Sequence, residues 1–153
     1  MLMRTVISTI LFIAAAATVS AQRYNVGEKL HYKVGYRAKL VPNTEMATAI
    51  VETSADTLDG RPVYKVLGRG KIMPSYRWFF NIDDKYRIWV DTLTKRTLRF
   101  ESDIYEGGYT FRSNYRYDWD AMKVHTWAQS RQNEPKTATM DLTCLLYTSP
   151  SPR

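Results

Sequence analysis

The sequence predicts an all-β domain, an antiparallel meander that curls into an open, barrel-like sheet. Three observations support this prediction. Apolar and polar residues alternate with a period of two in many segments, which is typical of half-buried strands. These segments recur at spacings of about ten residues with turn residues between them. The composition includes 11 tyrosines and 4 tryptophans, which suit a pleated surface better than a helix.

The N-terminal segment, residues 1–21, has the three-part layout of a secretory signal peptide. Arg4 supplies the positive charge, an uncharged run extends from Thr5 to Val19, and a small-residue triplet ends at Ala21. The run is short for a membrane span and rich in Ala, Ser and Thr. We therefore expect cleavage near Ala21 and a periplasmic or otherwise exported protein without a transmembrane span, with a buried N-terminal helix as the alternative.

The C-terminal segment, residues 144–153, has no periodicity and differs in composition from the rest of the chain. It resembles one reading frame of a transposon-derived sequencing adapter, so we interpret it as non-native and expect the natural C-terminus to be truncated. A disordered Ser/Pro-rich tail is the alternative. Residues 22–143 then form a single, incomplete β-rich domain. Because Cys144 is the only cysteine, this domain has neither a disulfide nor a thiol nucleophile.

The first strands follow from alternation and turn residues. Residues 27–40 alternate over more than ten positions and predict the first strand, with a turn at Pro42-Asn43. A second, less regular strand is expected at 45–57. The Asp59-Gly60 pair predicts a hairpin turn into a third strand at 63–71.

The remaining strands form a series of hairpins. An aromatic segment occupies 76–82, Asp83 to Lys85 are interpreted as a turn, and strands are predicted at 86–91, 96–105, 109–118, 123–128 and 136–142. Gly107 and Gly108 predict a tight turn between two of these strands, because glycine readily adopts positive φ angles. In 96–105 and 109–118, apolar and charged residues lie on opposite faces.

Charge and motifs argue against several classes of function. The formal charge is +7, but basic and acidic residues are interleaved, which indicates a solvated surface and no nucleic-acid partner. His31 and His125 lie on polar strand faces without a neighbouring nucleophile motif. We therefore predict no catalytic residues and no enzymatic activity, with a hydrolase of unrecognised site as an alternative.

The acidic residues also have simple explanations. Asp83-Asp84 is typical of turn chemistry, and we expect Glu101 and Asp103 to pair with Arg112 or Arg116 across the hairpin. No cluster has the spacing of a metal site, and no glycine-rich phosphate loop is present, so no metal and no cofactor are predicted.

The segment from Val26 to Tyr36, VGEKLHYKVGY, resembles the opening of a family of exported bacterial proteins, Domain of Unknown Function 3108. The resemblance continues to about Val124 through a small-residue strand at 47–51 and an ordered series of short motifs. These motifs are Gly60-x-Pro62-x-Tyr64, Asp84-Lys85-Tyr86, Asp91, and Glu106-Gly107-Gly108-Tyr109. The resemblance implies an envelope protein with a β-rich, barrel-like fold and no established catalytic residues.

Aromatic residues are the candidate ligand-binding residues. If the sheet curls, they could line a cavity for an acyl chain of a lipid or for another apolar ligand. The candidates are Tyr32, Tyr36, Trp78, Phe80, Tyr109, Phe111, Tyr115 and Tyr117. A packed interior is one alternative, and a scaffold that binds envelope proteins through exposed aromatic and arginine side chains is another. The expected function is therefore that of an exported, non-enzymatic envelope protein that binds an apolar ligand.

Overall fold

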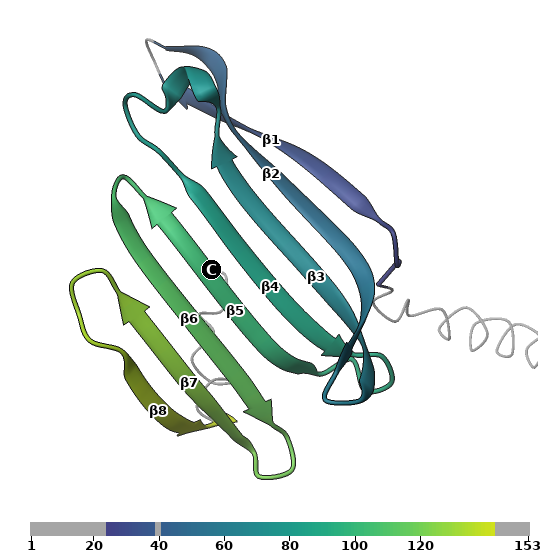
Figure 1. The fold of residues 1–153 in the computed structure, drawn as a ribbon. Helices are drawn as coiled ribbons and strands as arrows, with labels where there is room; N and C mark the ends of the chain where they lie inside the picture. The colour runs from purple at the N-terminus through teal and green to yellow at the C-terminus, as the bar shows by residue number, and fades with distance from the viewer. Residues whose placement is uncertain (1–23, 39–40, 143–153) are drawn as a thin grey trace, which may run out of the picture.

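A computed structural model describes residues 24–38 and 41–142, of which 36–38 and 41–43 are described by their backbone alone. The predicted signal peptide and the adapter-like segment lie outside the described residues. The described chain forms one eight-stranded sheet with a single short 3₁₀ turn, η1 (Figure 1). The elements are β1 (Lys29–Ala38), β2 (Val41–Leu58), β3 (Arg61–Ile72), η1 (Pro74–Tyr76), β4 (Asp83–Asp91), β5 (Thr97–Glu106), β6 (Tyr109–Asp118), β7 (Lys123–Ser130) and β8 (Lys136–Asp141).

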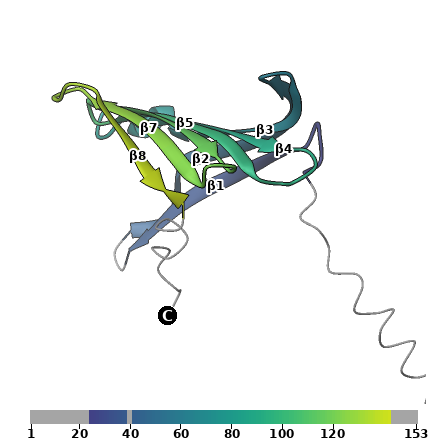
Figure 2. The same ribbon diagram turned by 90° about the horizontal axis from the view of Figure 1, so that it is seen from below.

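The strands follow one another in sequence order, and each pairs antiparallel with the next. The outermost strands β1 and β8 bend toward the same side, so the sheet is a curved, single layer (Figure 2). These two strands are its edges, and the sheet does not close into a barrel. The predicted all-β, open antiparallel meander is therefore confirmed.

Local sequence explains the tight hairpins. Asp59 and Gly60 have φ angles of 51° and 78°, and Gly107 and Gly108 have 55° and 92°. Two consecutive positive φ angles match the turn type whose twist suits antiparallel strands. At the β4–β5 connection, Asp91 Oδ1 accepts hydrogen bonds from the backbone N–H groups of Leu93 and Thr94. The hairpins predicted at Asp59-Gly60 and at Gly107-Gly108 are confirmed, and residues 92–96 connect two paired strands.

The turn predicted at Asp83 to Lys85 is wrong, because these residues begin β4 and pair with Lys71, Gly70 and Arg69 of β3. Arg69 donates two hydrogen bonds to the Asp83 carboxylate, at 3.0 and 2.9 Å. The Asp84 carboxylate accepts a hydrogen bond from the backbone N–H of Tyr105. Both carboxyl groups therefore have hydrogen-bond partners within the sheet. Tertiary contacts therefore override the low strand propensity of aspartate.

The turn predicted at Pro42-Asn43 is also wrong, because both residues lie inside β2. The β2–β3 pairing starts only at Ala47, so this end of β2 has a strand on one side alone. Proline is tolerated where the backbone N–H is not needed for a second neighbour. The register shift between Val34 and Gly35 of β1 lies beside this end.

The pairing register separates two faces of the sheet. One face, which we call the aromatic face, carries large apolar side chains from β1 to β6; they include Leu30, Tyr32, Val34, Tyr64, Val66, Tyr86, Ile88, Phe100, Ile104, Phe111, Tyr115 and Tyr117. The opposite, charged face carries Lys65, Arg69, Arg87, Arg99, Glu101, Asp103, Arg112 and Arg116. Because the sheet is one layer thick, few residues are fully buried; the largest are Val63, Val90 and Val124.

Candidate functional site

A ladder of rings crosses the centre of the aromatic face. Phe100 of β5 lies between Tyr86 of β4 and Tyr115 of β6, with ring centroids 6.3 and 5.6 Å apart. Phe100 pairs directly with Tyr115, whereas Tyr86 is a diagonal neighbour. Such tilted ring pairs contribute about 0.5–1.5 kcal/mol beyond the area that they bury. The ladder therefore holds three rings in fixed positions on one side of the sheet.

Small residues flank the ladder. Tyr86 lies between Gly68 of β3 and Ser102 of β5 in the register, and a Cβ on Gly68 would be in ordinary van der Waals contact with Tyr86 Cβ, at 3.7 Å. Ser102 pairs with Ser113, and their buried hydroxyl groups share a hydrogen bond of 2.7 Å. The two serines thus satisfy each other, and the residues beside Tyr86 in the register are small.

The aromatic face is exposed to a degree that is unusual for large apolar side chains. Tyr32 is 50% exposed and Tyr86 is 36% exposed. Among the described strands, the exposed large hydrophobic residues other than Tyr105 all lie on this face; they are Leu30, Tyr32, Val34, Tyr86, Tyr109 and Met140. Exposed large apolar side chains gathered on one face are typical of interaction sites.

The titratable groups confirm that the two faces differ in environment. Burial raises the pKa of Asp84, Tyr86 and Tyr117, all of which lie on the aromatic face. On the charged face, the hydrogen bond from Arg69 lowers the pKa of Asp83. The pKa of Asp56 is lowered chiefly by the backbone N–H of Thr57 and the Trp89 indole N–H. Burial therefore disfavours the charged forms of these three groups on the aromatic face, whereas N–H donors stabilise the carboxylates of Asp83 and Asp56 on the charged face.

The structure brings some of the predicted ligand-binding residues together. Tyr32, Tyr109, Phe111, Tyr115 and Tyr117 share the aromatic face. Tyr36 lies in β1, but its side chain is outside the described part. The sequence interpretation omitted Tyr86 and Phe100, which connect the others. Their alternation with charged neighbours was the signal that could have found them.

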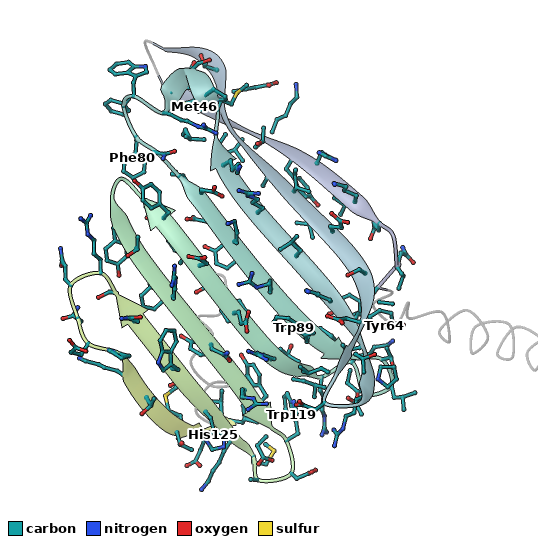
Figure 3. All side chains as sticks on the ribbon, viewed as in Figure 1. Met46, Tyr64, Phe80, Trp89, Trp119 and His125 are labelled. Atoms are coloured by element: carbon teal, nitrogen blue, oxygen red, sulfur yellow. The ribbon has the colours of Figure 1, made fainter. Side chains whose placement is uncertain are left out.

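Trp78 and Phe80 lie elsewhere, in the segment between η1 and β4. Trp78 is 84% exposed and contacts the ring of Phe79, with centroids 5.9 Å apart. Phe80 packs over Gly107 of the β5–β6 hairpin, at the opposite end of the strands from Trp119 (Figure 3). Tyr117 stacks on Trp119 at 6.3 Å, so the predicted residues are distributed over both ends of the sheet.

A polar groove of about 800 Å³ lies on the charged face across β4–β8. Its floor is a register row, Arg87, Glu101, Asn114, Trp127 and Thr137, and Arg112, Arg116, His125 and Thr139 border it. None of the predicted aromatic residues lines this groove. Sequence reasoning placed His125 on a polar strand face but did not identify the groove.

The charged face is crossed by ion pairs around Glu101. This carboxylate contacts Arg87 Nε at 3.0 Å and also Arg99 Nη2, while Asn114 Nδ2 donates to it at 3.4 Å. The predicted Asp103–Arg112 pair is confirmed at 3.7 Å. A pairing of Glu101 with Arg112 or Arg116 is wrong, because Glu101 is directly opposite Arg87 and two residues from Arg99 on β5 and contacts both. Arg116 instead pairs with Asp59 at 3.4 Å.

The described residues contain no group of three or more His, Cys, Asp or Glu side chains that could hold a metal ion. In the same part of the chain, no helix has the length and apolar character needed to cross a membrane.

Comparison with known families assigns the chain. The family model described as "Protein of unknown function (DUF3108)" matches residues 30–148, which is most of the sequence. This chain belongs to the DUF3108 family. The resemblance seen in the sequence is thereby confirmed, and the DUF3108 match extends into the adapter-like segment, whose origin remains a prediction. No curated protein and no solved structure matches, so residue roles in this DUF3108 protein are argued from its own geometry.

Proposed function

We propose that this DUF3108 protein is an exported, non-enzymatic envelope protein that binds a lipid or another apolar ligand on its aromatic face. The observation that carries the proposal is the exposure of apolar side chains on a single face of an open, curved sheet. Export is proposed from the signal-peptide layout of residues 1–21.

The chemistry of the face suits an acyl chain. Each methylene group that is removed from water contributes about 0.8 kcal/mol. A chain laid along the ladder of Tyr86, Phe100 and Tyr115 would contact three rings that are already held by one another. Since these rings already pack against one another, ligand binding should cost less side-chain entropy than it would with three isolated rings.

A matched pair of substitutions tests the proposal. Tyr86 and Tyr105 are equally exposed, at 36% and 37%, but lie on opposite faces. Tyr86→Lys places an ammonium group on the aromatic face, whereas Tyr105→Lys places one on the charged face. We expect Tyr86→Lys to weaken binding of a fluorescent fatty acid at least about tenfold, because it removes one ring of the ladder and adds a charge that an acyl chain would have to dehydrate, and Tyr105→Lys to leave it within about twofold.

The titration of the unmodified chain is the primary measurement. Absence of saturable fatty-acid binding, or equal weakening by both lysine variants, would contradict the proposal. Lipid extraction from protein purified out of the envelope, followed by mass spectrometry, identifies the natural ligand.

Partner binding is a second candidate, favoured by the exposed pair Trp78 and Phe79, which are 84% and 73% exposed. Aromatic residues are enriched at protein interfaces. The double variant Trp78→Ser/Phe79→Ser should then lose an envelope partner in cross-linking experiments while it retains fatty-acid binding. An unchanged cross-linking pattern would eliminate this candidate.

A further inference from the structure

The polar groove on the charged face contains two arginines whose hydrogen-bonding capacity is only partly used. Arg112 and Arg116, both on β6, have side chains that are 67% and 61% exposed. Their partners, Asp103 and Asp59, lie at 3.7 and 3.4 Å through single contacts. Exposed pairs of this kind contribute little to stability. Both guanidinium groups therefore retain N–H donors for a ligand.

Arg69, on the same face, forms an ion pair in which both carboxylate oxygens of the partner are bound. It donates to both oxygens of Asp83, at 3.0 and 2.9 Å, in the two-pronged geometry that guanidinium and carboxylate prefer. Arg112 and Arg116 have no such partner among the described residues. A carboxylate or phosphate group would complete their geometry.

Local charge at the border of the groove also favours an anion. Arg99 of β5 is directly opposite Arg116 of β6, and His125 of β7 is next in the same row. Like charges opposite each other on neighbouring strands are destabilising. Glu101 and Asp59 each offset one of these two guanidinium charges, and an anion placed beside Arg116 would reduce the repulsion further.

The floor of the groove offers a site for a polyhydroxyl ring. Trp127 lies between Asn114 and Thr137 in the register, and no described residue accepts a hydrogen bond from its indole N–H. His125 and Thr139 share a hydrogen bond of 2.9 Å on the next row. An aromatic surface bordered by amide, hydroxyl and imidazole groups suits a sugar, whose C–H groups pack on the indole while its hydroxyl groups form hydrogen bonds.

We propose that this groove binds an acidic carbohydrate. The anionic group, a carboxylate or a phosphate, contacts Arg112 and Arg116, and the sugar ring lies on Trp127. The groove and the aromatic face are on opposite sides of the sheet, so this proposal does not depend on the binding of an apolar ligand.

Nuclear magnetic resonance titration of the full chain tests the proposal. The probes are glucuronate, glucose 1-phosphate, neutral glucose and inorganic phosphate, and the readout is the indole N–H signal of Trp127, assigned with Trp127→Phe. We expect saturable shifts with glucuronate, glucose 1-phosphate or both. Neutral glucose should give none, and inorganic phosphate should bind at least about tenfold more weakly than the sugar phosphate, because it lacks the ring contact.

A charge-matched control separates the groove from general electrostatics. Arg112→Gln and Arg116→Gln should each weaken binding at least about tenfold, because each removes a charge-assisted hydrogen bond to the anionic group. Lys123→Gln, which removes one exposed positive charge at the start of β7, should change it less than about twofold.

Three results would overturn the proposal. The first is that neither acidic sugar gives a saturable shift of the Trp127 indole N–H signal. This result needs only the unmodified chain. The second is that neutral glucose or inorganic phosphate binds with the same affinity as the acidic sugars. The third is unchanged affinity in both arginine variants, with folding checked by circular dichroism.

Discussion

Asp83 and Asp84 are neighbours in sequence, yet their carboxyl groups experience opposite environments. Asp83 lies on the charged face and is bound by Arg69, which lowers its pKa. Asp84 lies on the aromatic face, where burial raises its pKa, and the charge of Glu106 adds to the effect. The side of the strand to which each residue points therefore decides its titration, because strand side chains alternate between faces.

The pKa of Asp84 is higher in the folded chain than in the unfolded chain. The contribution of this group to the free energy of unfolding is therefore greatest at pH values below its unfolded-state pKa, and it is lost as the pH rises through its folded-state pKa. Asp84→Asn removes this penalty and keeps an oxygen that can accept from Tyr105 N–H. The variant should gain stability relative to the original chain as pH is raised from 3 to 7. Urea unfolding at both pH values measures this gain, and a constant difference would contradict it.

For Asp83 the sign is reversed. Its lowered folded-state pKa contributes stability that is present above the unfolded value and is lost as pH falls through the folded value. Asp83→Asn should therefore cost about 1 kcal/mol at pH 7, in keeping with a partly exposed pair. The cost should vanish in acid. The same urea series gives the answer, and an equal loss at pH 3 would show that the effect is not electrostatic.

Gly107 carries a further constraint at the residue scale. Its φ angle is 55°, and a Cβ there would lie 2.5 Å from Cε2 of Phe80. Gly107→Ala should thus cost backbone strain of about 1 kcal/mol and also displace the Phe80 ring. Gly27→Ala is the control, because Gly27 also has positive φ, at 88°, but open space around it. Thermal unfolding should show the larger loss for Gly107→Ala; equal losses would mean that Phe80 moves away freely.

At the scale of elements, the β5–β6 hairpin holds the centre of the sheet through a polar contact on an apolar face. The hydroxyl groups of Ser102 and Ser113 are both buried, so each depends on the other for a partner. A buried hydroxyl without a partner costs about 1–3 kcal/mol.

Ser102→Ala should therefore destabilise the chain by about 1–3 kcal/mol, because it leaves Ser113 unsatisfied. Ser102→Ala/Ser113→Ala should recover part of this loss, since no buried hydroxyl then lacks a partner. A double-mutant cycle of denaturant unfolding measures the coupling. Additive losses would show that water replaces the missing hydroxyl.

At the scale of the whole molecule, the strands of an open, single-layer sheet differ in how well their backbone amides are protected from hydrogen exchange. β1 and β8 each pair on one side, whereas β3 to β6 are paired on both sides. Every residue of β8 is exposed. Edge strands with free backbone groups also tend to associate with other chains.

Hydrogen exchange should reveal this difference. Amide protection should be highest in β4 and β5 and lowest in β1 and β8, because local opening of an edge strand breaks one ladder of hydrogen bonds while opening of a central strand breaks two. Mass spectrometry of the exchanging chain, at a concentration low enough to prevent self-association, measures this profile. Uniform protection would instead indicate that the edges are covered.

Much of the fold follows from the sequence alone. Alternation in segments such as 97–106 and 109–118 fixes which side chains share a face, since the side-chain period of a strand is two. Glycine and aspartate at positions 59, 60, 107 and 108 fix the hairpins through positive φ angles. The family resemblance and the open antiparallel meander are likewise determined by these local patterns.

Tertiary structure alone decided the rest. Asp83 to Lys85 are strand residues because Arg69, on the neighbouring strand, binds Asp83, and a local pattern contains no information about that partner. The ladder through Phe100 and the groove beneath Arg116 arise from the register between strands. Periodicity specifies the face of each residue, whereas cross-strand neighbours depend on pairing and twist, and those neighbours form both proposed sites.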